Sequence, residues 1–426
     1  MNRGCCILHA LPSCLLVLVM ARTCTAQENF SWEQTKTRFE AANPVLKANL
    51  LAVDEMRAEE ITAFLRPNPQ FTLAADGTQI APDQGVWQPM TGTFVVPTIS
   101  YLHERAHKRE LRQQSAQEGT RITSAQSDDV KRNLEFTLRQ AFVATLESKA
   151  VLELARADLA YYDRIIEIAR ARYQAGDIAQ IDLDRIELLR VQYEVEIQSA
   201  TVSLRTAKIQ LLQLLNDRTP VEQFDVNGPF DFSDSLQPLD AYRQIALANR
   251  PDLQAALQTA QQAETNHKLA IANGSTDPTW SGWYTWNSSN NNPHGLQTVG
   301  GSVNIPLRIF DRNQGEKQRT LLDINRSQQL EEATRAQVFS DVDSAYTQVQ
   351  SSVELLRPYK AKYRDQATRV RDTVTYAYQH GGASLMDFLN AQSDYRTVQL
   401  AYLQLIGSYL TAAGQLNLAV GTEAIQ

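Results

Sequence analysis

The length, composition and charge of the chain exclude several classes of protein. It has 426 residues, of which 43% are hydrophobic and 21% charged, so it can form a sizeable core and is not disordered by composition. Lys+Arg 41 against Asp+Glu 48 give a formal net charge of −7, and no Lys/Arg-rich block could follow a phosphate backbone. We therefore expect no nucleic-acid partner.

Residues 1–26 have the features of a secretory signal peptide. Arg3 precedes an apolar stretch from Leu11 to Met20, and Cys24-Thr25-Ala26 supplies small residues for cleavage. All four cysteines lie in this segment: Cys5, Cys6, Cys14 and Cys24. The predicted mature chain therefore has no disulfide, no thiolate metal ligand and no catalytic cysteine. Lipidation of Cys24 after a lipoprotein signal is an alternative.

Short motifs of the first half return in the second half, which indicates an internal repeat. The stretch Asn43–Ala48 returns 207 positions later as Arg250–Ala255, with Pro and Leu at the same places. The stretch Tyr173–Gly176 returns 205 positions later as Tyr378–Gly381. Because order and spacing are both kept, the two halves are expected to share one structural plan.

The repeat divides the chain into two units of the same design. Residues 27–216 and 242–426 are each predicted to form a helix, two strands, a very long helix, a Gly-containing turn and a further helix, and 217–241 is a Pro- and Asp-containing connector. The segment from Thr98 to Ala175 contains one Gly and no Pro, so it is predicted to be one helix about 117 Å long.

The helices after each turn carry hydrophobic residues at intervals of seven. The two lines that define this period are Ile186, Tyr193, Ala200, Ala207 and Leu214 in the first half and Tyr395, Tyr402, Tyr409 and Leu416 in the second. A sustained seven-residue period indicates helices that pack lengthwise. Arg357-Pro358 within the second long helix predicts a kink or a break.

The predicted strands alternate between apolar and polar residues. In Trp280–Asn287 the aromatic residues are separated by small or polar ones, and Gln297–Ile305, Pro69–Ala75 and Met90–Val96 complete the set. This period of two is typical of a barrel strand with lipid outside and water inside. The aromatic residues predicted to form a membrane-interface girdle, in preference to a soluble core, are Trp280, Trp283, Tyr284 and Trp286.

Four strands are too few to close a transmembrane barrel, because single-chain barrels begin at about 8 strands. Several copies of the chain must therefore share one barrel. Three copies would supply twelve strands, and their helices would continue the pore as a helical tube.

The repeated plan and its motifs resemble the outer-membrane efflux protein family, whose members are TolC-like channels. The motifs that carry this resemblance are Asn43-Pro44-x-Leu46, Arg250-Pro251-Asp252-Leu253, Ile305–Gly315 and the two Tyr-x-x-Gly turns, each followed six residues later by Asp. Pro67-Asn68-Pro69 before the first strand and Asp311–Gly315 after the last are most similar to the CzcC-like heavy-metal efflux branch.

The resemblance implies a fold, a location and partners. The expected fold is mainly α with a small β part: a homotrimer with a 12-stranded transmembrane β-barrel, continued by a long periplasmic α-helical barrel. The expected location is the outer membrane of a Gram-negative bacterium. The implied partners are a periplasmic adaptor protein and an inner-membrane pump of the RND or ABC type.

The family also implies a pore constriction at the periplasmic tip. The residues that match its acidic lining are Asp182 and Asp387, and Tyr378 matches the tyrosine that braces the closed state. Asn390 replaces a second acidic residue of the best-known members, and Ala383 replaces an arginine. Like charges in such a ring raise one another's pKa and attract cations.

The turns at the tip have a second interpretation besides the gate. The pattern Ser384–Asp387 fits a helix N-cap, so Asp387 has a capping role as an alternative or in addition. The turn residues are primarily structural, because a tight turn between helices needs residues that tolerate positive φ. They are also the expected contact for the adaptor: Gly176, Asp177, Gly381 and Gly382.

No catalytic or metal-binding motif is found in the sequence. His103 and His107 are four residues apart without an evident third ligand, so we expect no metal site, no cofactor and no enzymatic activity. The predicted function is the passive exit duct of a tripartite efflux system. The alternatives are the outer-membrane component of type I secretion, a periplasmic adaptor and a soluble coiled-coil scaffold.

Overall fold

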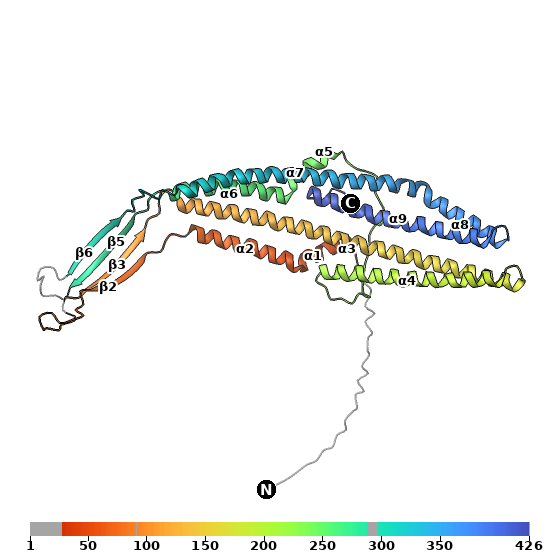
Figure 1. Ribbon diagram of the computed structural model, residues 1–426, viewed down its shortest axis with the longest axis horizontal. Helices are drawn as coiled ribbons and strands as arrows, with labels where there is room; N and C mark the ends of the chain where they lie inside the picture. Colours follow the sequence, from red (N-terminus) through yellow and green to blue (C-terminus); the bar gives the residue numbers. More distant parts are fainter. Residues whose placement is uncertain (1–27, 91, 288–296, 426) are drawn as a thin grey trace, which may run out of the picture.

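The computed structural model describes residues 28–90, 92–287 and 297–425. The predicted signal segment lies outside the described residues. The described chain is elongated, with a four-stranded sheet at one end, long helices running away from it, and two helix-to-helix turns at the far end (Figure 1). We call the far end the tip.

The elements follow the same order in both halves, as the repeat predicts. The first half contains β1 (Glu28–Phe30), α1 (Trp32–Ala42), α2 (Pro44–Phe64), β2 (Gln70–Asp76), β3 (Phe94–Leu102), α3 (Lys108–Ala175) and α4 (Gln180–Leu214). After β4 (Phe224–Val226), the second half contains α5 (Leu239–Asn249), α6 (Pro251–Asn273), β5 (Thr279–Asn287), β6 (Gln297–Asn304), α7 (Gln314–Pro358), η1 (Tyr359–Tyr363), α8 (Arg364–Gln379) and α9 (Leu385–Val420). The fold is mainly α with a small β part, as predicted.

The long helix of the first half begins later than the sequence suggested. We predicted helix from Thr98 onward, but Thr98–Leu102 continues strand β3 and α3 begins at Lys108. The reason is tertiary: Thr98 to Leu102 pair with Trp283 to Thr279 of β5, and this pairing outweighs the absence of helix breakers. With 68 residues, α3 still extends for about 100 Å.

The repeated Pro motif stands at the start of a helix in both halves, but the residue before the proline makes different contacts in each half. Asn43 caps α2, since its side-chain oxygen accepts hydrogen bonds from the backbone N–H groups of Val45 and Leu46. Arg250 makes no such cap at α6. It is 4% exposed, and its guanidinium contacts Asp252 at 2.6 Å and Asp341 at 2.8 Å.

The helices form one layer with two free edges. Along the tip half the order of packing is α4, α3, α9 and α8, and along the sheet half it is α2, α3, α6 and α7. The sheet has the order β2-β3-β5-β6. One edge of the molecule therefore consists of β2, α2 and α4, which we call the first edge, and the other of β6, α7 and α8, which we call the second edge (Figure 1).

The second long helix is interrupted where the sequence predicted a kink. Helix α7 ends at Pro358, and Tyr359–Tyr363 form a π-helical turn before α8 begins. Proline cannot donate the hydrogen bond of a regular helix, and π-turns occur where the ladder is disturbed. Two ion pairs hold this turn to the connector: Arg357 with Asp234 at 2.6 Å and Lys360 with Asp231 at 2.7 Å.

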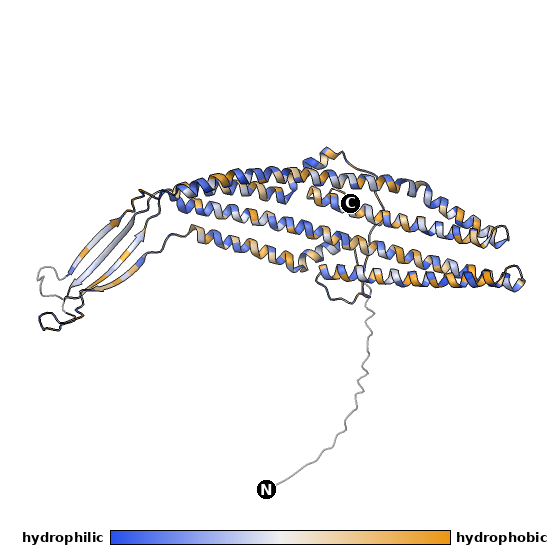
Figure 2. Ribbon diagram, in the orientation of Figure 1, coloured by the Kyte–Doolittle hydropathy of each residue, from blue (hydrophilic) through white to orange (hydrophobic). Residues whose placement is uncertain are grey.

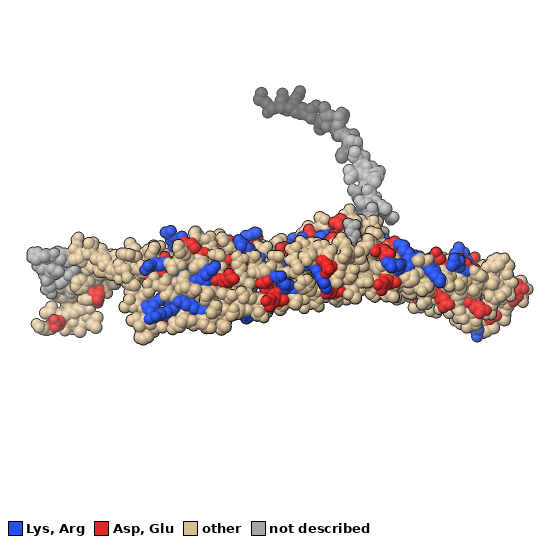
Figure 3. All heavy atoms as spheres, turned by 90° about the horizontal axis from the view of Figure 1, so that it is seen from above, with Lys and Arg blue, Asp and Glu red and all other residues tan. Residues whose placement is uncertain are grey.

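Hydrophobic and charged residues alternate along the helices. Figure 2 shows both kinds mixed on every long helix, and Figure 3 shows basic and acidic side chains distributed along the helical body. Among the described helices, none combines the length and the apolar character that crossing a membrane requires.

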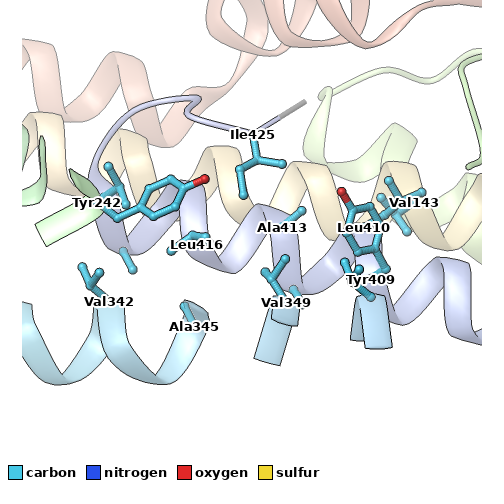
Figure 4. Packing of buried hydrophobic residues seen from close by; sticks show 14 of the residues in the cluster. Val143, Tyr242, Val342, Ala345, Val349, Tyr409, Leu410, Ala413, Leu416 and Ile425 are labelled. Atoms are coloured by element: carbon cyan, nitrogen blue, oxygen red, sulfur yellow. The ribbon is translucent and has the colours of Figure 1, made fainter. Parts of the chain in front are cut away.

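The largest buried cluster lies where the second half packs on itself, near the middle of the molecule. Figure 4 shows side chains of α7 and α9 converging with Tyr242 of α5 and Ile425 of the C-terminal segment. The predicted seven-residue line is largely part of this core, since Tyr402, Tyr409 and Leu416 are buried. A second cluster surrounds β1 and β4, and a third lies between the helices near the tip.

Candidate membrane sheet and gate

The register of the sheet separates two faces of different chemistry. Cross-strand partners share a face, so one face of β3 and β5 pairs Val95 with Trp286, Ile99 with Gly282, and Tyr101 with Trp280. The residues of this largely apolar face are Phe71, Leu73 and Ala75 of β2, Val95, Pro97, Ile99 and Tyr101 of β3, Trp280, Gly282, Tyr284 and Trp286 of β5, and Gln297, Val299, Gly301 and Val303 of β6. It lacks charged residues.

The opposite face of the sheet is mostly small and polar. Between its Thr, Ser, Asn and Gln residues lie a few larger apolar ones, and Asp76 is the single charged residue in the four strands. The apolar face is nevertheless exposed, as is most of the polar face of β2 and β6: Phe71 is 68% exposed, Ile99 60% and Val299 84%. A water-facing sheet would bury such a face, so an apolar partner must cover it.

Three of the four predicted interface aromatics lie on the apolar face, and one does not. Trp280, Tyr284 and Trp286 are exposed there, at opposite ends and the middle of β5. Trp283 lies on the other face and covers Gly300, where an added Cβ would come within 2.5 Å of its ring. The alternation of a strand separates it from its neighbours.

Two glycines with positive φ form the turns of the tip. Gly176 has φ 82° and Gly381 has φ 77°, and each follows the end of a long helix. The N–H of Asp177 donates to the carbonyl of Arg172 at 2.9 Å, and the N–H of Gly382 donates to that of Ala377 at 2.7 Å. These bonds satisfy the last carbonyl groups of the helices.

Asp387 caps helix α9, as the alternative interpretation proposed. Its carboxylate accepts hydrogen bonds from the Ser384 hydroxyl at 2.7 Å and from the Ser384 backbone N–H at 3.1 Å. In return, the Asp387 N–H donates to the Ser384 hydroxyl at 3.1 Å. These bonds hold the pKa of Asp387 below its ordinary value. The side chain is exposed, so a pore-facing role stays a prediction beside this capping role.

Tyr378 is buried between the two helix pairs at the tip. It is 3% exposed, stacks on Phe388 with ring centroids 5.0 Å apart, and faces the Arg172 guanidinium at 5.2 Å. Its hydroxyl has no hydrogen-bond partner among the described residues. Burial, with a smaller contribution from the charge of Asp182, raises the pKa of Tyr378. The partly buried Asp182 is therefore close enough to act on Tyr378 electrostatically.

The positions that depart from the family pattern lie beside the cap. Asn390 is exposed on α9, one turn after Asp387, and Ala383 precedes the capping serine. Neither residue carries a charge. The acidic residues near the two turns of the tip are Asp177, Asp182, Asp184 and Asp387.

Three contacts between the helix pairs were not found by sequence reasoning. Arg172 donates to the backbone carbonyl of Tyr378 at 2.6 Å, and the Tyr161 hydroxyl donates to Thr375 Oγ1 at 2.9 Å. Farther from the tip, Arg396 of α9 forms an ion pair with Glu196 of α4. The partners are about 200 residues apart, and no local pattern identifies them as pairs.

Within the described part of the chain, no group of three or more His, Cys, Asp or Glu residues could hold a metal ion. His103 and His107 lie in the short irregular segment between β3 and α3, and the side chain of His107 is 88% exposed. The helical pair that a metal site would need is therefore absent at these two residues.

Comparison with known proteins finds similarity to outer-membrane efflux proteins. A model of the family described as outer membrane efflux protein matches residues 242–422. The cobalt-zinc-cadmium resistance protein CzcC of Cupriavidus metallidurans is 23% identical over 386 residues, which cover 88% of this chain and 86% of CzcC. The second repeat of this chain therefore matches the outer membrane efflux protein family.

Solved structures of outer-membrane channels share the fold of this chain. CusC superimposes with a TM-score of 0.78 at 17% identity, over 92% of both chains. The open-state outer membrane channel MtrE of Neisseria gonorrhoeae gives a TM-score of 0.74 at 18% identity, over 92% of this chain and 89% of MtrE. At these identities the likeness concerns the fold, which confirms the predicted helical barrel plan with a tandem repeat.

Proposed function

We propose that this chain is the outer-membrane exit duct of a tripartite efflux system. The observation that carries the proposal is the sheet register, which gathers the apolar side chains on one exposed face and leaves the other face polar. Such a sheet fits a wall between lipid and water. Trp280 and Trp286 lie six residues apart on β5, a rise of about 20 Å, which suits two aromatic belts at the membrane surfaces.

Three copies would complete the wall and the duct. The first and second edges are different surfaces of one chain, so their contact between copies is head-to-tail and closes into a ring. Three copies would form a closed twelve-stranded barrel with a helical barrel below it. This assembly rests on the family fold and on the unpaired edges of β2 and β6.

The seam between copies has matching features on both edges near the tip. On α4, exposed apolar residues recur every seven positions: Ile181, Leu188, Val195, Val202 and Ile209. On the other edge, Tyr363 and Val370 are exposed seven residues apart. Residues 180–199 of α4 contain five acidic and two basic residues, net −3, whereas residues 359–379 contain five basic and two acidic ones, net +3. Apolar pattern and charge are therefore complementary.

At the tip, Asp182 and Asp387 would line the pore constriction, with Asn390 beside them and Tyr378 holding the helix pairs together. The exposed turn at Gly176 and Asp177 and the turn at Gly381 and Gly382 are the proposed contacts of a periplasmic adaptor. An inner-membrane pump would supply the transport energy, since a family of channels has no catalytic role. Similarity to CzcC along 88% of the chain favours metal cations as the cargo of the system.

Reconstitution tests the proposed duct. Detergent-extracted outer membranes should yield a trimer that dissociates on heating, and the purified trimer should form ion-conducting pores in planar bilayers. In a strain that lacks the duct, expression should restore resistance to cobalt, zinc or cadmium. A monomeric protein without conductance would contradict the proposal, whereas a conducting trimer that restores only drug resistance would correct the cargo.

A further inference from the structure

A cavity of about 870 Å³ lies near the middle of the chain, where the two repeats meet. Its walls come from α1 and α3 of the first repeat, from α9 and the C-terminal segment of the second, and from the connector. None of its lining residues belongs to β2, α2, α4, β6, α7 or α8. The cavity is therefore distinct from the two edges and from the tip, and its volume is in the range of small-molecule sites.

Much of the cavity wall is apolar and held in place. Val143 is 3% exposed, Leu146 7% and Leu410 6%, and the Phe142 ring packs edge-on against Trp32 with centroids 5.5 Å apart. The C-terminal side of the wall is pinned by Asn417, whose side chain bonds the backbone of Ala424 and Ile425 at 2.6 to 2.8 Å. The wall is thus formed before any ligand enters.

One arginine in this wall forms no direct ion pair among the described residues. The Arg139 guanidinium lies over the Trp32 ring at 4.5 Å, and its stem contacts the position of Gly414 on α9. Among the described residues, Arg139 makes neither a hydrogen bond nor an ion pair, and it is partly buried. Burial lowers its pKa, although the charges of Glu423 and Glu33 act in the opposite direction.

The other basic residues of the cavity are already neutralised. Lys36 pairs with Glu423 at 3.0 Å and with Glu135 at 3.5 Å. Lys131 pairs with Glu40 at 2.9 Å, and Arg132 pairs with Asp129. Within the described cavity wall, Arg139 is therefore the basic residue that forms no direct ion pair, and a guanidinium binds oxyanions through two parallel hydrogen bonds.

We propose that this cavity binds a small amphipathic carboxylate, whose head pairs with Arg139 and whose hydrocarbon part lies against Phe142 and Leu410. The ligand would touch both repeats at once, through α3 and α9. It would act as a bridge between them outside the conduit itself.

The test uses the full-length trimer in a neutral detergent at pH 8, with 11-bromoundecanoate as the probe. Its bromine quenches tryptophan fluorescence, and Trp32 lies in the cavity wall. We expect a saturable component of quenching that Trp32→Phe abolishes, above the non-saturable quenching of the detergent-facing Trp280 and Trp286. The uncharged 11-bromoundecanol should bind about tenfold more weakly, because it lacks the charge-assisted bonds to Arg139.

Two variants separate the charge from the cavity. Arg139→Met should weaken bromoundecanoate binding about tenfold and leave bromoundecanol binding within about twofold, while Arg139→Lys should retain most of the affinity. Gly228→Leu should block both probes, since a Cβ there faces Phe142 and Leu146 at 3.5 to 3.6 Å. Arg326→Met, at an exposed position of α7, is the matched control.

Equal affinity for the acid and the alcohol would overturn the proposal. So would unchanged binding in both Arg139→Met and Gly228→Leu. Should Arg139→Met fail to form a trimer, Arg139→Lys and Gly228→Leu still decide the question, because neither removes the positive charge from the wall. The test is independent of conductance, so its failure leaves the proposed duct untouched.

Discussion

At the scale of single residues, the structure assigns two acidic side chains very different surroundings. Asp387 is exposed and held ionised by its cap, whereas Asp158 of α3 is partly buried between helix pairs. Burial raises the pKa of Asp158 to about 6, opposed by Arg396 and Arg371 and reinforced by Glu196. The Tyr193 hydroxyl also faces this group. The pKa of the aspartate carboxyl group is therefore raised at Asp158 and lowered at Asp387.

Asp158 should make the stability of the helix pairs depend on pH. Its folded-state pKa is raised, so its stabilising contribution is present below the unfolded value of 3.8 and is lost as pH rises through about 6. Asp158→Asn should therefore raise the free energy of unfolding relative to wild type by about 1 kcal/mol per chain at pH 7.5 after solvent screening, and by less at pH 5. Thermal melts at the two pH values measure this; a constant difference between the proteins would contradict it.

Asp387 allows its capping role to be separated from its predicted pore role. Ser384→Ala removes the cap and costs about 1 kcal/mol of helix stability but keeps the carboxylate. If Asp387 lines the constriction, Asp387→Ala should raise single-channel conductance or weaken block by divalent cations, and Ser384→Ala should change neither. Asp182→Ala should act in the same direction as Asp387→Ala. Unchanged conductance in both aspartate variants would leave capping as the role of Asp387.

At the scale of elements, the two tips show how one local rule produces a hairpin of long helices. Helix α3 ends one residue before Gly176 and α8 ends two residues before Gly381; both glycines have positive φ, and the following backbone N–H groups close the last helical turn. Around Gly176 and Gly381 nothing lies within 4 Å of an added Cβ, so the requirement there is for backbone conformation alone. Packing does not dictate these glycines.

Adjacent glycines at the second tip offer a matched pair. Gly381→Ala should destabilise the α8–α9 turn by about 1 kcal/mol, because its φ of 77° is unfavourable for a side chain. Gly382→Ala should be nearly neutral, since this residue lacks positive φ and its Cβ would meet Ala377 O at an ordinary 3.6 Å. Hydrogen exchange at the tip measures the difference. Equal protection in the two variants would show that the turn tolerates either residue.

At the scale of the whole molecule, the chain is a curved strip that is incomplete alone. Its sheet has unpaired edges at β2 and β6, and its helices expose an apolar line on α4. Charges of opposite sign flank the proposed seam, near the tip, on the two edges. Head-to-tail closure satisfies all three features together, and isolated chains satisfy none of them.

Cysteine pairs test the seam directly. Leu188 lies eight residues after the first residue of α4, and Val370 lies nine residues before the last residue of α8, so both are at similar distances from the tip. In a chain whose other cysteines all lie in the predicted signal segment, Leu188→Cys with Val370→Cys should give a disulfide-linked trimer. Leu188→Cys with Leu330→Cys, an exposed position of α7 much farther from the tip, is the control. Linking only in the control pair would refute the proposed register.

The sequence by itself determined the repeat, the helix starts at Pro44 and Pro251, the tip glycines and the alternation of the strands. Each of these depends on a local rule: a Pro after a cap, a positive φ, a period of two or of seven. Only the tertiary structure decided that β3 continues to Leu102, that Trp283 covers Gly300, and that Asp158 and Arg139 are partly buried beside particular neighbours. Those outcomes depend on pairing and burial between segments far apart in the chain, and such contacts leave no periodic signal in the sequence.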